Sequence, residues 1–280
     1  MMKNSFYKTK YSIVLILAIL FAGGFYLSKK NSITKKLVIP GRPLFKQQNN
    51  VGTLTLRKQN DRQIVAEKEK FDLVLSGKSE KILVGGYDAV VKFDPNIVSF
   101  ETNKSLNNRF DVVATRRDGE VIVTGTIKDD GKAIAIDATP LTILTFSALK
   151  EGNANIFVEK DLQNKQRDSN IINPKGVDIL DSVENPTVFV GKKITATSKD
   201  VKVNDTAIVI NSVELPSAGC SDCVTIVNAQ ITKGAETERL KFTTGGIAGK
   251  PQTPTEAFGV LYEIGNVTNT GVEVYFAPKQ

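Results

Sequence analysis

The stretch Gly86–Phe100, which reads GYDAVVKFDPNIVSF, decides the fold of this chain. Its apolar residues fall at every second position from Tyr87 onward. Because side chains on a strand alternate between faces, the pattern predicts a strand with one buried and one mixed face. Pro95 has no N–H to give to a ladder and ends the strand. We expect Asp94 to cap the following turn through its own side chain, and residues 97–100 to form a second short strand.

The same strand signals recur outward from this stretch, whereas helical patterns are rare. Asp118-Gly119 separates two alternating runs, which is a strong signal for a β-hairpin. We expect further strands at 54–56, 71–75, 82–84, 110–114, 121–125, 133–136, 141–149, 155–158, 187–190, 201–203, 207–213, 224–231, 239–242, 258–264 and 272–276. Residues 161–175 are polar and predict a long loop. Many short strands with frequent turns predict an all-β protein built from sandwiches.

The chain has 280 residues, which leaves room for two ordinary domains. Gly191-Lys192-Lys193 predicts a boundary between them. We expect a membrane anchor or signal segment over residues 1–30, a linker over 31–50, a β-sandwich over 51–191, and a smaller β-sandwich or barrel over 194–279.

Tyr11–Leu27, YSIVLILAILFAGGFYL, is an apolar run between Lys10 and Lys29. A membrane-spanning helix needs about 17–25 such residues, so the run predicts a single-pass transmembrane helix. Small residues at 22–24 leave a cleaved signal peptide as the alternative. Both interpretations place the folded domains outside the cell, either held at the cell membrane or secreted.

Charge and composition exclude several classes of function. The net charge is +7, but residues 1–48 hold nine Lys and Arg and no acidic residue, which leaves −2 for residues 49–280. The folded part therefore lacks the positive charge that nucleic-acid binding requires. The chain has no His, so it has no Ser-His-Asp or Cys-His catalysis and no His metal ligand. We expect no catalytic residue, no cofactor and no metal site.

Three segments resemble successive parts of cohesin domains. VVKFDPNIVSF (90–100) resembles the segment from strand 3 to strand 4, DDGKAIAIDATPLTILTFSALKEGNANIFV (129–158) a later segment, and NPKGVDILDSVENPTVFVG (173–191) the closing strand. The resemblance covers about residues 51–191. It implies a nine-stranded jelly-roll sandwich that binds a partner protein without catalysis, usually a calcium-loaded dockerin.

Asp88, Val90 and Lys92 are the candidate partner-binding residues. Alternation places them on the outward face of their strand, together with Gly86. The resemblance puts Asp88 where cohesins carry a strand-3 aspartate that accepts hydrogen bonds from dockerin, whereas Gly86 stands where many cohesins carry a polar contact residue. The alternative is a solvated strand face. An outward Val90 has no explanation on such a face and therefore favours an interface.

Cys220-Ser221-Asp222-Cys223 is a CxxC motif in a predicted loop. A thioredoxin-type site needs its first Cys at a helix N-terminus in a βαβ unit, and this neighbourhood predicts loop and strand. A zinc site needs four ligands, and the chain has no other Cys and no His. A local disulfide between Cys220 and Cys223 in an exported domain is the remaining interpretation.

A carbohydrate-binding or purely structural surface module is the alternative function, because related jelly-roll sandwiches bind polysaccharide. Sugar platforms usually need exposed aromatic rings. The chain has no Trp and six Tyr, of which Tyr11 and Tyr26 lie in the apolar run and Tyr87 is predicted to be buried. This scarcity favours docking of a protein partner over binding of a polysaccharide.

Overall fold

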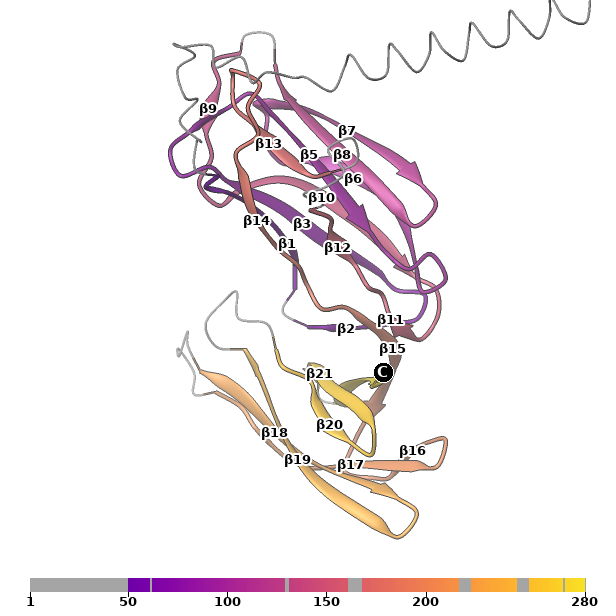
Figure 1. The fold of residues 1–280 in the computed structure, drawn as a ribbon. Coiled ribbons are helices and arrows are strands. Elements are labelled where there is room, and N and C mark those ends of the chain that lie inside the picture. Colours follow the sequence, from indigo (N-terminus) through magenta and orange to yellow (C-terminus); the bar gives the residue numbers. More distant parts are fainter. Residues whose placement is uncertain are drawn as a thin grey trace, which may run out of the picture. The chain divides into compact units, whose positions relative to one another are not determined.

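The computed structural model describes residues 50–60, 62–128, 131–160, 168–216, 223–245, 252–268 and 270–279. All regular secondary structure in these ranges is β-strand (Figure 1). The predicted anchor at Tyr11–Leu27 and the predicted linker, except for its last residue Asn50, lie outside the described residues. Within the described ranges, no helix is long and apolar enough to cross a membrane.

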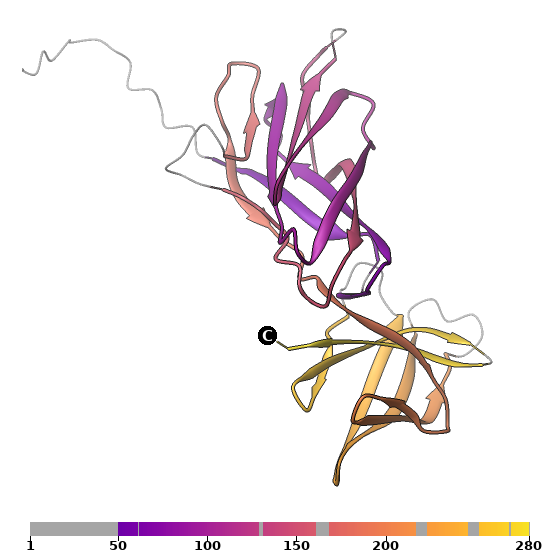
Figure 2. The same ribbon diagram turned by 90° about the vertical axis from the view of Figure 1, so that its right-hand side faces the viewer.

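The first half of the described chain forms two facing sheets (Figures 1 and 2). One sheet has the strand order β14-β1-β3-β10-β6. Its strands are β1 (Gly52–Lys58), β3 (Lys70–Lys78), β6 (Val98–Ser105), β10 (Thr139–Ala148) and β14 (Leu180–Glu184). The other sheet has the order β12-β5-β8-β7, and β13 also pairs with β5. Its strands are β5 (Gly86–Lys92), β7 (Phe110–Arg117), β8 (Glu120–Ile127), β12 (Phe157–Val158) and β13 (Asn170–Ile172).

Aromatic rings fill the middle of the core between these two sheets. The ring of Phe146 on β10 lies 5.8 Å from that of Phe71, 5.4 Å from that of Phe93 and 5.6 Å from that of Phe100, measured between centroids. All four side chains are buried in one cluster that contains residues of both sheets. The prediction that Tyr87, Val91 and Phe93 are core residues is confirmed.

The second half forms a smaller two-sheet sandwich with its own core, and the first half adds the short strands β2 and β11 to one of its sheets. One sheet has the order β11-β15-β22-β21-β20, with β2 paired to β15, and the other has the order β16-β17-β18-β19. The strands of the first are β2 (Ile64–Ala66), β11 (Gly152–Asn153), β15 (Phe189–Ala196), β20 (Thr255–Ala257), β21 (Val260–Thr268) and β22 (Gly271–Pro278). Those of the second are β16 (Val201–Val203), β17 (Thr206–Glu214), β18 (Val224–Lys233) and β19 (Glu236–Gly245). The short strands β4 (Leu83–Val84) and β9 (Ile134–Ala135) pair with each other.

The chain passes from one core to the other within a single strand. β15 runs through Gly191-Lys192-Lys193 without interruption, and its Val190 belongs to the first core while its Ala196 belongs to the second. A Cβ on Gly191 would stand 2.0 Å from the carbonyl oxygen of Phe276, so only glycine fits at this crossing. The three residues that predict a domain boundary therefore lie within a strand that is continuous across both cores.

The local turn predictions hold, and two strand predictions need correction. The Asp94 carboxylate accepts a hydrogen bond from the Asn96 N–H at 2.9 Å, and Gly119 turns the β7–β8 hairpin with a φ of +66°. The predicted loop at 161–175 contains β13, which the sequence analysis missed. The predicted strand at 187–190 does not close the first sandwich by itself. Instead β14 pairs with β1 in parallel, with a register shift between Gly52 and Thr53.

Candidate functional site

The candidate site is the outward side of the sheet β12-β5-β8-β7. Directly opposite residues of antiparallel strands point to the same side, so the register defines which side chains share this face. Its rows across β5, β8 and β7 are Asp88–Thr124–Val113, Val90–Ile122–Thr115 and Lys92–Glu120–Arg117, and Phe157 on β12 lies opposite Lys92. We call these ten residues the outer face.

Four apolar residues cross the outer face along a diagonal. Val113 on β7 is a diagonal neighbour of Ile122 on β8, which stands opposite Val90 on β5, and Val90 is a diagonal neighbour of Phe157. Diagonal pairs of this kind lie about 7–8 Å apart at the backbone, within reach of one another's side chains. Val113 is 63% exposed, Phe157 is 40% exposed and Ile122 is half-buried. We call these four residues the diagonal strip.

Polar side chains flank the diagonal strip, and most of their charge is already paired. On one side the Asp88 carboxylate accepts a hydrogen bond from the Thr124 hydroxyl at 2.5 Å. On the other side the Lys92 ammonium lies 2.8 Å from the Glu159 carboxylate. The Arg117 guanidinium lies 3.3 Å from the Glu120 carboxylate. Paired charges around exposed apolar side chains suit a contact that excludes water at its centre.

The structure places Asp88 and Lys92 half-exposed on the outward face, but it corrects the expectation for Val90. Val90 is only 2% exposed. Its N–H donates to the Ser169 hydroxyl and its carbonyl accepts from the Glu159 N–H. Alternation predicts the face of a side chain, but it does not show whether that face is covered. Val90 therefore lies at the centre of the strip without being free for a partner. The partner-binding role of the three residues stays a prediction.

Sequence reasoning missed the two most exposed members of the strip. Val113 follows from the alternation of Phe110, Val112 and Ala114, because an apolar residue between inward positions must point outward. Phe157 could not be assigned in this way, because β12 has only two residues and offers no periodicity. Its face follows only from its pairing with Lys92.

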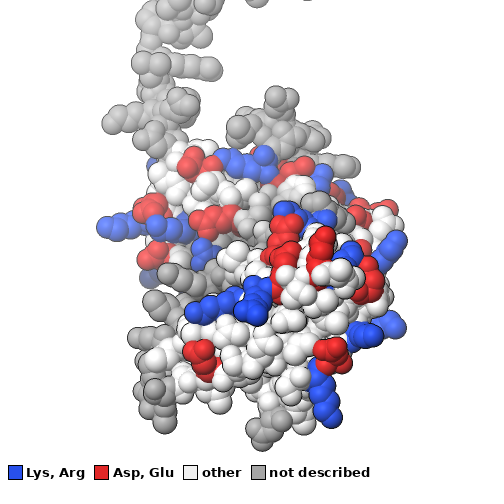
Figure 3. Space-filling model, turned by 90° about the horizontal axis from the view of Figure 1, so that it is seen from below, with Lys and Arg blue, Asp and Glu red and all other residues white. Residues whose placement is uncertain are grey.

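Other candidate chemistry is sparse in the described part of the chain. No three His, Cys, Asp or Glu residues among those described lie close enough together to hold a metal ion. In the face shown in Figure 3, basic and acidic residues are interspersed and form no large area of one sign. Cys223 lies directly before β18, whereas Cys220 lies outside the described residues. Their disulfide stays a prediction.

Comparisons by sequence give no match: no protein-family model and no curated protein matches the chain. Comparisons by structure find solved cohesin modules. One, from a family 33 glycoside hydrolase of Clostridium perfringens, is 13% identical, covers 49% of this chain and 99% of its own, and has a TM-score of 0.40.

A type II cohesin from the cellulosome of Acetivibrio cellulolyticus is 15% identical, covers 50% of this chain and 95% of its own, and has a TM-score of 0.40. The sixth cohesin of scaffoldin B from the same organism, solved in complex with a dockerin, is 9% identical. It covers 50% of this chain and 98% of its own, with a TM-score of 0.38. About half of this chain is thus similar in structure to cohesin modules.

Proposed function

We propose that the chain is a cell-surface protein that docks a partner protein through the outer face, without catalysis. The observation that carries the proposal is the diagonal strip, which exposes Val113 and Phe157 between hydrogen-bonded and ion-paired polar groups. Apolar patches rimmed by polar residues are typical of protein interaction sites. The segments that resemble cohesins include the last three residues of β5 and all of β12, which supports a dockerin-type partner.

The same proposal includes an anchor at Tyr11–Leu27 that holds residues 49–280 outside the cell. The apolar run supports the anchor, and the short basic tail with Lys3, Lys8 and Lys10 suits a cytoplasmic end. Protease added to intact cells should then degrade the folded part of the chain. Its full protection would contradict this topology, and recovery of a soluble form beginning near Phe25 would indicate cleavage.

Binding of a polysaccharide to the outer face is less well supported than binding of a protein. Tyr87, Tyr262 and Tyr275, the only tyrosines among the described residues, are all buried. Phe157 is the one aromatic ring of the outer face. A single half-exposed ring offers little of the planar stacking surface that sugar rings use.

The test compares substitutions inside and outside the diagonal strip. The full chain is first used to capture a partner from the secreted proteins of its source organism, and the affinity of that partner is then measured by calorimetry. We expect Val113→Asp and Phe157→Asp each to weaken binding at least about tenfold, because each places a charge in a contact from which water is excluded. Leu149→Asp is the matched control, since Leu149 is exposed but lies after β10, outside the outer face.

All three variants should unfold at the temperature of the unchanged chain, because the replaced side chains are exposed. Equal affinity of both strip variants and the Leu149→Asp control would contradict the assignment of the outer face. Capture of no partner at all would contradict the docking function itself.

A further inference from the structure

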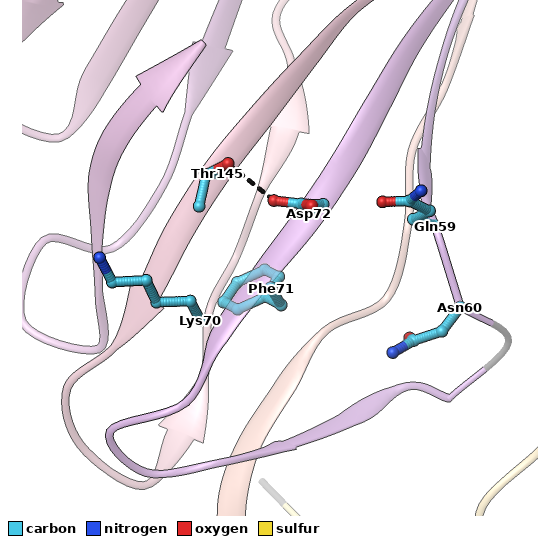
Figure 4. Close-up of a pocket in the computed structure, with 6 residues that line it drawn as sticks. All are labelled: Gln59, Asn60, Lys70, Phe71, Asp72 and Thr145. Atoms are coloured by element: carbon cyan, nitrogen blue, oxygen red, sulfur yellow. Dashed lines mark hydrogen bonds between the residues drawn. The ribbon is translucent and has the colours of Figure 1, made fainter. Parts of the chain in front are cut away.

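A polar cleft lies on the outward side of the sheet β14-β1-β3-β10-β6. This is the side of the first sandwich opposite to the outer face. The cleft has a volume of about 500 Å³ and is lined by Gln59, Asn60, Lys70, Phe71, Asp72 and Thr145 (Figure 4). Gln59 and Asn60 directly follow β1, and the other four residues come from β3 and β10. The volume lies within the range of about 300–1,000 Å³ that small-molecule sites have.

The strand register gathers three of these side chains into one row. The Gln59 N–H donates to the Asp72 carbonyl at 3.0 Å, and Thr145 lies opposite Asp72 on the other side of β3. Gln59, Asp72 and Thr145 therefore point to the same side of the sheet. In Figure 4 the side chains of Gln59 and Asn60 extend from the end of β1 toward Asp72 and Phe71, and Lys70 lies on the far side.

Most of the hydrogen-bonding capacity of the cleft is unused within the described residues. The Thr145 hydroxyl donates to one Asp72 carboxylate oxygen at 2.7 Å, and the second oxygen has no partner among the described residues. The side-chain amides of Gln59 and Asn60 and the Lys70 ammonium likewise have no hydrogen bond or ion pair there. The cleft thus offers two amides, an ammonium and a carboxylate oxygen to a ligand.

We propose that this cleft binds a short neutral saccharide. Neighbouring sugar hydroxyls each donate and accept, and the cleft presents amide and ammonium donors beside amide and carboxylate acceptors. The Asp72 carboxylate lies in the cleft, whereas the Lys70 ammonium extends to its far side, so the cleft does not favour an anion. The inference does not depend on the proposed docking function, because no residue of the cleft belongs to the outer face.

The lining also determines what kind of saccharide fits. Phe71 is buried and contributes only to the floor, so the cleft has no exposed ring against which a sugar could stack. Recognition must then come from hydrogen bonds, which are individually weak in water. We therefore assign the cleft to a chain end or a disaccharide bound at millimolar affinity, and not to the flat surface of a crystalline polysaccharide.

Saturation-transfer NMR on the full chain tests this assignment, with the protein held in a detergent that has no sugar headgroup. The probes are cellobiose, maltose, xylobiose and di-N-acetylchitobiose, together with triglycine as a peptide probe. We expect saturable binding of at least one disaccharide and none of triglycine. The double variant Gln59→Ala/Asn60→Ala should abolish the signal, because it removes both amides. Asp72→Asn should weaken binding about tenfold, which corresponds to one hydrogen bond to a charged group.

Ser76→Ala is the matched control, since Ser76 lies on the same side of β3 but outside the cleft, and it should bind like the unchanged chain. The exposed Gln59 and Asn60 make no side-chain contacts that folding needs, so the double variant should keep its unfolding temperature. The proposal is overturned if no disaccharide binds at millimolar concentration, if the double variant binds as well as the unchanged chain, or if triglycine competes for the site.

Discussion

The two outward sides of the first sandwich differ in chemistry although they cover the same core. The outer face, on β12-β5-β8-β7, carries the diagonal strip between paired charges. The opposite side, on β14-β1-β3-β10-β6, carries a polar cleft lined by hydroxyl and amide groups, and an exposed ion pair between Arg57 and Glu184. Inward positions on both sheets are apolar alike, because they fill one core. Outward side chains do not have to fill the core. The chemical differences between the two outward sides therefore indicate what each side contacts.

The comparison extends to how each sheet treats its charged residues. On the outer face, Lys92 and Arg117 are partly exposed and ion-paired. On β1 of the opposite sheet, Lys58 has a buried ammonium with no hydrogen-bond partner among the described residues. The Lys58 ammonium lies 5.9 Å from the centre of the Phe71 ring. The opposite sheet therefore has, besides its exposed Arg57–Glu184 ion pair, a buried ammonium at Lys58.

The largest expected effect comes from the core that both sides share. Phe146→Ala removes a fully buried ring that contacts Phe71, Phe93 and Phe100. Such truncations cost about 3–5 kcal/mol, so we expect the free energy of unfolding to fall by that amount. Urea unfolding measures it. Because the core is common, partner binding and saccharide binding should be lost together at the denaturant concentration where this variant unfolds. Loss of one activity without the other would show that the two sides are supported separately.

A smaller effect, of opposite sign, is expected at Lys58. Burial, and then the nearby Arg62 charge, lower the pKa of the Lys58 ammonium to about 8, although Glu263 and Glu69 act against them. At pH 7 the folded chain must keep this group charged where charge is unfavourable. Lys58→Met keeps most of the side-chain volume without the charge. We expect it to raise the free energy of unfolding at pH 7 by about 1–3 kcal/mol.

The pH dependence gives this prediction its sign. The pKa of Lys58 in the folded chain lies below that of the unfolded chain, which is about 10.4. Between pH 8 and about 10.4 the unfolded chain binds more protons, so the stability of the unchanged protein should rise with pH across this window. Lys58→Met should lose that rise, whereas Lys70→Met, a change at an exposed lysine, should keep it. Destabilisation of Lys58→Met at pH 7 would contradict the prediction.

The sequence predicted the strands of the first sandwich where alternation was long and turn residues were distinctive. β5, the Asp94 turn and the β7–β8 hairpin all follow from such signals. β13 and β20 have three residues each, and β2 is equally short, so they carry no period of their own. β2 and β13 pair with β15 and β5, which lie far away along the chain, so only the tertiary structure identifies these partners. β20 pairs with the next strand, β21, and was missed because it is short.

The candidate site was predictable in its face but not in its accessibility. Alternation correctly assigned Asp88, Val90 and Lys92 to the outward side. Val90 is only 2% exposed, and its backbone is hydrogen-bonded to Glu159 and Ser169, about 70 to 80 residues downstream, which the periodicity of β5 does not reveal. The polar cleft was not predicted at all, because its row joins Gln59, Asp72 and Thr145 from three strands.

The smallest expected effect is at Asp88, and it separates a structural role from a binding role. Asp88→Ala removes the acceptor of the Thr124 hydroxyl, and a net hydrogen bond of this kind contributes about 0.5–1.5 kcal/mol. We therefore expect a small loss of unfolding free energy. Thr124→Val removes the same hydrogen bond but leaves the carboxylate in place.

If Asp88 also accepts hydrogen bonds from the partner, Asp88→Ala should weaken docking about tenfold while Thr124→Val leaves the affinity within about twofold of the unchanged chain. Calorimetry on both variants and on the double variant measures the difference. Equal losses of affinity in both single variants would mean that Asp88 serves the sheet and not the partner, and the contacts of the outer face would then rest on Val113 and Phe157.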